Sequence, residues 1–137
     1  MLKSLMSLSA FVALSGCMAS QSTVPFSRAQ AGDLAAPSNL SVAGVIDTTG
    51  VNIYSLFMDE GDRSGTDCIP LILDREGQTR AKRLAGSRAV VSGNAIPMAE
   101  LNQTMPNQYG EINGREWSGT RCTGRIAIYV TALKTIR

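Results

Sequence analysis

The chain of 137 residues contains no histidine and three cysteines, Cys17, Cys68 and Cys122. Without an imidazole, the Ser-His-Asp and Cys-His arrangements that activate a nucleophile cannot form, and neither can a histidine-bearing zinc site. The sequence also lacks the G-x-x-x-x-G-K-[ST] phosphate loop. General acid–base catalysis needs a positioned group with a suitable pKa, and the side chain most often used for it is missing. We therefore predict that the protein is not an enzyme and uses no cofactor.

An acidic stretch at residues 59–67, with the sequence DEGDRSGTD, could bind Ca²⁺ through its carboxylates. Its spacing departs from the D-x-[DN]-x-[DN]-G pattern of a calcium loop, and Arg63 places a cation among the possible ligands. We interpret this stretch as a solvated loop between two strands and predict no metal site. Calcium binding is the alternative.

The N-terminal segment has the pattern of an export signal. One cation, Lys3, precedes an apolar run that is too short to cross a bilayer. The tetrad at 14–17, with the sequence LSGC, resembles the lipobox of bacterial lipoproteins. This resemblance implies that residues 1–16 are a signal peptide and that Cys17 receives a diacylglycerol and becomes the first mature residue. Ordinary secretion with cleavage after Ala19 is the alternative.

A lipobox implies a protein held in the bacterial cell envelope by its lipid, and we predict the outer membrane, facing the periplasm. Residues 17–39 are rich in Ser, Ala, Gln and Pro, and we interpret them as a flexible tether. Residues 40–137 then form one small domain, of a size at which a hydrophobic core alone is marginal.

Cysteine parity supports the lipobox. Lipidation of Cys17 leaves an even pair, Cys68 and Cys122, in a compartment that favours disulfides. Closing a loop of about 54 residues would stabilise the fold by roughly 4 kcal/mol in the chain-entropy model, which is an upper figure. We therefore predict a disulfide between these two residues.

Apolar residues alternate with polar ones through most of the domain, which indicates a mainly β fold. A helix is predicted after Asp74, which can cap it, and before Gly86, which suits the left-handed position beyond its end. The predicted strands are 40–46 and 51–57, joined in a hairpin, then 68–73 as a buried strand, and finally 88–96 and 125–133.

The order of three strands, one short helix and two strands resembles the OB-fold, a five-stranded Greek-key barrel. The stretch from Leu84 to Gly93 is similar to the LxGxxVxVxG entry into a fourth OB strand, and Gly44 could permit the strong bend of the first. In an OB barrel the third and fifth strands are parallel, so their starts lie at one end. Cys68 opens the third strand and Cys122 stands just before the fifth, so this topology would allow their Cα atoms to approach within the roughly 5.5 Å that a disulfide needs.

The long segment 97–124, before the last strand, is the candidate binding site. It carries Tyr109, Arg115, Trp117 and Arg121, and in OB-folds the loop between strands four and five borders the ligand face. Its Asn-Gly pair at 113–114 predicts a type I′ turn and a small hairpin over 111–117. The alternative is that Tyr109 and Trp117 simply cover an open end of the barrel.

These observations predict a non-catalytic binding module, anchored through Cys17, for an envelope protein, peptide or glycan. A structural or assembly role in an envelope complex is the alternative. The net charge of +2 is too small to indicate nucleic acid, which would return as a partner only if the domain were not exported.

Overall fold

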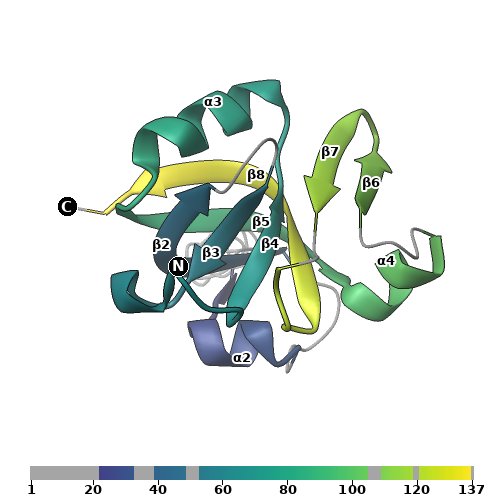
Figure 1. Cartoon of the computed structure of the whole chain (residues 1–137), viewed down its shortest axis with the longest axis horizontal. Helices are drawn as coiled ribbons and strands as arrows, with labels where there is room; N and C mark the ends of the chain where they lie inside the picture. The colour runs from purple at the N-terminus through teal and green to yellow at the C-terminus, as the bar shows by residue number, and fades with distance from the viewer. Residues whose placement is uncertain (1–21, 33–38, 49–52, 105–108, 119–120, 137) are drawn as a thin grey trace, which may run out of the picture.

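Five strands close into a barrel in the computed structural model, which describes residues 22–32, 39–48, 53–104, 109–118 and 121–136. They are β2 (Asn39–Thr48), β3 (Tyr54–Phe57), β4 (Cys68–Ile72), β5 (Arg88–Pro97) and β8 (Ile126–Thr135). They pair in the order β2-β3-β4-β8-β5, and β5 pairs again with β2 (Figure 1). β4 and β8 are parallel, and the other pairs are antiparallel. The predicted OB-like barrel is confirmed.

Apolar side chains on alternate positions of the strands fill the barrel. β4 is buried along its whole length: Leu71 lies in the interior core, and Ile72 lies in a second cluster on the outside. The prediction of a strand buried on both faces is therefore correct. The interior also contains Val42, Ile46, Leu56, Ile69, Ala89, Val91, Ile128 and Val130.

Gly44 lies where β2 leaves its partner β5 and joins β3, because Val45 pairs with Arg88 on one side and Phe57 on the other. A Cβ atom at Gly44 would stand 2.5 Å from the carbonyl oxygen of Phe57. The glycine therefore permits the close approach that this bend requires.

The predicted helix is α3 (Arg75–Leu84), between the third and fourth barrel strands. The Asp74 carboxylate caps it by accepting a hydrogen bond of 2.6 Å from the backbone N–H of Gly77. Gly86 follows with φ +83°, the left-handed conformation that glycine adopts without strain. α3 buries Ala81 in the core and covers one end of the barrel, opposite the end that α2 (Phe26–Gln30) covers (Figure 1).

The structure corrects the predicted tether for residues 22–32. β1 (Ser22–Thr23) pairs in parallel with β2 at Leu40 and Ser41, and α2 buries Phe26 and Ala29 in the barrel core. Burial of these two apolar side chains makes the segment part of the fold. The helix has five residues, which is too short to produce a readable 3.6-residue period.

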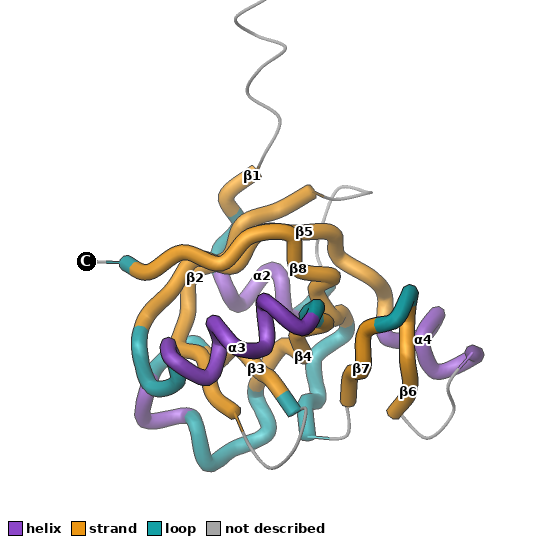
Figure 2. Tube along the Cα trace, turned by 90° about the horizontal axis from the view of Figure 1, so that it is seen from above, coloured by secondary structure: helices purple, strands orange, loops and turns teal. Residues whose placement is uncertain are grey.

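The segment between β5 and β8, residues 98–125, is called the insertion below. It contains α4 (Met98–Thr104), which the sequence analysis did not predict, and a hairpin of β6 (Tyr109–Ile112) and β7 (Arg115–Ser118). Asn113 and Gly114 have φ values of 50° and 80°, as a type I′ turn requires, so the predicted hairpin is confirmed. Figure 2 shows the hairpin beside β4 and β8, with α4 beyond it.

Tyr54 is buried in the core with 2 % exposure, and its hydroxyl has no hydrogen-bond partner among the described residues. We expect Tyr54→Phe to stabilise the protein by about 1 kcal/mol in urea unfolding at pH 7, because it removes an unpaired buried hydroxyl. Burial also raises the pKa of Tyr54. Below the unfolded-state pKa of about 10, Tyr54 is protonated in both states and its full contribution to the free energy of unfolding is present. As pH rises through the folded-state pKa, this contribution is lost, because the unfolded state loses its proton first.

Tyr54→Phe should therefore lose less stability than the wild type between pH 9 and pH 11. A destabilised variant at pH 7 would show that the Tyr54 hydroxyl has a hydrogen-bond partner, and equal alkaline losses in the two proteins would show that it is in contact with water.

Candidate functional site

The insertion packs on the outer face of β4 and β8, the third and fifth strands of the barrel. OB-folds usually bind their ligands on a face centred on the second and third strands, so the covered surface shares one strand with that face. Trp117 of β7 is 1 % exposed and packs with Met98 and Leu101 of α4 against Ile72 and Ala127. Ile72 and Ala127 are the outward-facing residues of β4 and β8. The chain's own side chains therefore cover the outer face of the third strand.

Arg115 fastens the hairpin to the barrel where β4 and β8 diverge. Its guanidinium donates hydrogen bonds to the carbonyl oxygens of Ile72, at 3.2 Å, and Val130, at 2.8 Å. The guanidinium carbon lies 4.0 Å from the centroid of the Tyr129 ring, and Asp74 is 3.7 Å away. The side chain is 16 % exposed, so most of its binding capacity is used within the fold.

We expect Arg115→Met to release the hairpin, because two backbone carbonyl oxygens lose a charged donor, at a cost of about 2 kcal/mol. Trp117 is the single tryptophan of the chain. Its fluorescence should shift to longer wavelength when release of the hairpin exposes it to water. Arg83→Met, on the exposed face of α3, is the matched control and should leave the spectrum unchanged. An unshifted spectrum for Arg115→Met would mean that the apolar contacts of Trp117 hold the hairpin alone.

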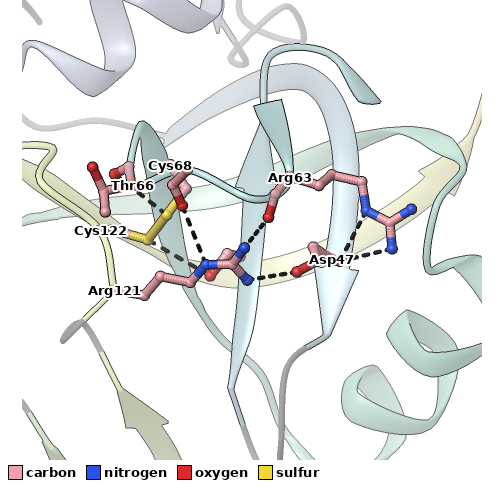
Figure 3. A network of polar contacts seen from close by, with 8 residues as sticks. Asp47, Arg63, Thr66, Cys68, Arg121 and Cys122 are labelled. Carbon is pink, nitrogen blue, oxygen red and sulfur yellow. Dashed lines mark hydrogen bonds and ion pairs between the residues drawn. A yellow bond between two sulfur atoms is a disulfide. The ribbon is translucent and has the colours of Figure 1, made fainter. Parts of the chain in front are cut away.

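A second polar network fixes the end of the insertion to β2 (Figure 3). Asp47 is 7 % exposed and accepts from Arg63, with Nε to Oδ1 at 2.9 Å, and from Arg121, with Nη1 to Oδ2 at 2.6 Å. Arg121 also donates to the carbonyl oxygens of Gly65 and Arg63, and its guanidinium carbon lies 4.8 Å from the centroid of the Phe57 ring. One buried carboxylate thus holds two arginines.

The predicted disulfide is confirmed beside this network. Cys68 and Cys122 are bonded with their Cα atoms 4.9 Å apart, and both pack on Phe57. Cys68 begins β4 and Cys122 shortly precedes the parallel strand β8, as the barrel topology predicts. The bond joins the end of the insertion to the barrel.

The four predicted ligand-binding residues do not converge on one open site. Arg115 and Trp117 lie together in β7, whereas Arg121 lies in the separate network around Asp47. Tyr109 begins β6, where it pairs with Ser118. The side chains of Arg115, Trp117 and Arg121 all contact the barrel.

The acidic stretch 59–67 contains the short 3₁₀ helix η1 (Glu60–Asp62). Two of its charged side chains form ion pairs outside the stretch. Asp59 lies 3.5 Å from Arg88, and Arg63 binds Asp47. In the part of the chain that the structure describes, no group of three or more Asp, Glu, Cys or His side chains is placed to hold a metal ion.

A groove of about 480 Å³ lies between the end of α2, the start of α4 and the residues that lead into β8. We call it the Arg125 groove, and its lining residues are Ala31, Gly32, Pro97, Met98, Ala99, Asn102, Gly124, Arg125 and Ile126. Its volume lies within the range of small-molecule sites, roughly 300–1,000 Å³. The sequence does not predict this groove, because three segments far apart in the chain build it and none has a recognisable motif.

Two polar side chains of the Arg125 groove have no partner in the described part of the chain. The Asn102 Oδ1 atom is buried and has no hydrogen-bond partner among the described residues. The Arg125 side chain is exposed, and within the described ranges its guanidinium forms no ion pair. Two backbone hydrogen bonds of 2.8 Å fix the Arg125 backbone. Its N–H donates to the Gln30 carbonyl oxygen, and its carbonyl oxygen accepts from the Met98 N–H.

These features define an OB-like barrel with an insertion packed on the outer face of β4 and β8 and a separate open groove. In the comparisons with known proteins, no family model, no curated protein and no solved structure matches the chain. Over the described ranges, no helix is both long and apolar enough to span a bilayer.

Proposed function

We propose that the protein is an envelope lipoprotein, anchored through Cys17 in the outer membrane and facing the periplasm. Its barrel acts as a non-catalytic binding module for an envelope protein, peptide or glycan. The observation that carries this proposal is the Arg125 groove, an open and mostly apolar recess with two polar groups that have no side-chain partner among the described residues. The absence of histidine from the sequence supports binding rather than catalysis.

The position of β1 supports a short connection between the lipid and the barrel. Ser22 already belongs to the sheet, and it follows Cys17 by five residues. An extended chain of that length reaches about 17 Å. A barrel anchored at Cys17 therefore stays next to the membrane surface, which suits capture of partners at or near that surface.

Membrane fractionation of the wild type and of Cys17→Ala tests the anchor. We expect the wild type in the membrane fraction, with labelled palmitate and globomycin-sensitive processing, and the variant in the soluble fraction without label. The Cys68–Cys122 disulfide lies far along the chain and should be intact in both proteins, which controls for misfolding. Equal membrane binding and processing of the two proteins would exclude lipidation at Cys17.

A structural or assembly role is the second candidate, and the insertion packed on the outer face of β4 and β8 favours it. Side chains that could have met a ligand, Arg115 and Trp117, instead hold the insertion on the barrel. A photo-cross-linking residue placed in cells at Ala99, in the Arg125 groove, or at Arg83, on α3, separates the two candidates. Adducts from Ala99 alone support the binding module, whereas adducts from Arg83 alone support assembly through the helix face.

A further inference from the structure

The chemistry of the Arg125 groove defines a ligand class, and this step rests on the proposed binding function. We propose that the groove binds a carboxylate that has an apolar side chain and an N–H donor close beside it. A C-terminal apolar residue of a peptide and a free N-acyl amino acid both have this chemistry.

Arg125 supplies the site for the carboxylate. A guanidinium presents a planar fork of N–H donors that matches the two oxygens of a carboxylate. Most other arginines near the barrel face already have partners: Arg63 and Arg121 bind Asp47, and Arg115 binds backbone carbonyls. The backbone hydrogen bonds of Arg125 to Gln30 and Met98 fix the base of its side chain at the wall of the groove.

Asn102 supplies the acceptor for the N–H donor. Met98 and Asn102 are four residues apart on α4, so they lie on the same side of the helix. The Met98 backbone N–H donates to the Arg125 carbonyl oxygen, which places the start of α4 next to Arg125. The Asn102 Oδ1 atom is buried and has no partner among the described residues, so it gains a hydrogen bond when the Asn102 amide turns into the groove and accepts from a ligand.

The remaining lining suits a small apolar side chain. Met98 and Ile126 are largely buried, and they line the groove together with Ala99 and Pro97. Gly124 and Gly32 add no side chain to the walls. An apolar surface with a few placed polar groups is the usual composition of a small-ligand site.

The test is a titration of the full mature chain in detergent micelles, followed by amide chemical shifts in NMR spectra. The probe is N-acetyl-L-leucine, which has the carboxylate, the N–H and the apolar side chain. We expect saturable shifts at Ala99, Asn102 and Arg125, with a Kd in the millimolar range. N-acetyl-L-leucinamide, which lacks the carboxylate, should bind at least about tenfold more weakly.

Three variants locate the site. Arg125→Gln should weaken binding of N-acetyl-L-leucine at least about tenfold, and Ala99→Phe should weaken it by filling the groove. Arg83→Gln removes an exposed cation from α3 and is the matched control, with unchanged binding expected. Unchanged amide spectra away from the groove show that each variant is folded.

The two sources of the ligand are separated by the tripeptide Ala-Ala-Leu. Tighter binding of the tripeptide than of N-acetyl-L-leucine identifies a peptide C-terminus, and equal binding identifies a free acyl amino acid. Absence of saturable shifts, or equal binding of acid and amide, overturns the proposed ligand class. The cross-linking experiment at Ala99 separates this failure from a failure of the binding function. If Ala99 forms adducts in cells but N-acetyl-L-leucine does not bind, only this ligand chemistry is excluded.

Discussion

Gly93→Ala is expected to destabilise the barrel by at least about 3 kcal/mol. Gly93 of β5 faces β8, where a Cβ atom would overlap the carbonyl oxygen of Tyr129 and stand 2.9 Å from its carbonyl carbon and 3.0 Å from the Val130 Cα. All three atoms belong to the backbone, so no side-chain rotation relieves the overlap. The two strands must separate, and they form the longest pairing of the barrel.

Urea unfolding followed by far-ultraviolet circular dichroism measures this loss. Gly61→Ala is the matched control, because no atom lies within 4 Å of a Cβ at Gly61, and its free energy of unfolding should stay within about 0.5 kcal/mol of the wild type. An unchanged midpoint for Gly93→Ala would mean that β5 and β8 are further apart at this point than the structure has them.

Removal of the disulfide is expected to have an effect of similar size. The double variant Cys68→Ala, Cys122→Ala opens a loop with a sequence separation of 54 residues, and the chain-entropy model gives a loss of about 4 kcal/mol. Small domains have roughly 5–15 kcal/mol of stability in total. The loss corresponds to a fall in Tm of roughly 15–30 °C for a domain of this size.

Thermal unfolding with and without reductant gives the control within one experiment. Reductant should lower the Tm of the wild type to that of the double variant, while the double variant itself should not respond. If the wild type keeps its Tm after mass spectrometry shows both thiols free, the bond does not contribute to stability.

The barrel could be predicted from the sequence because two independent constraints agree. Alternating apolar residues give the strands, and the positions of Cys68 and Cys122 select a topology in which the third and fifth strands are parallel. The helix α3 could be predicted because its capping residues, Asp74 and Gly86, act locally. Local signals and a covalent constraint are readable without knowledge of tertiary contacts.

The site could be predicted much less well. Trp117 is an aromatic residue on a short strand, and periodicity does not distinguish burial under an insertion from exposure at a ligand face. The Arg125 groove forms where α2 and α4 lie beside the residues before β8. Both helices are short and have no clear period or cap in the sequence. Tertiary packing alone brings these three segments together.

The connectivity of the disulfide has a consequence for the order of folding. β8 pairs with β4 on one side and β5 on the other, and both of these strands belong to the covalent ring that runs from Cys68 to Cys122. β8 itself lies outside the ring. Once the thiols have joined, the ends of the ring are held together, and the entropy of bringing the start of β8 to β4 has already been lost. The last strand then completes the barrel by local zipping, so formation of the disulfide would accelerate the pairing of β4 with β8, whose partners lie furthest apart in the sequence.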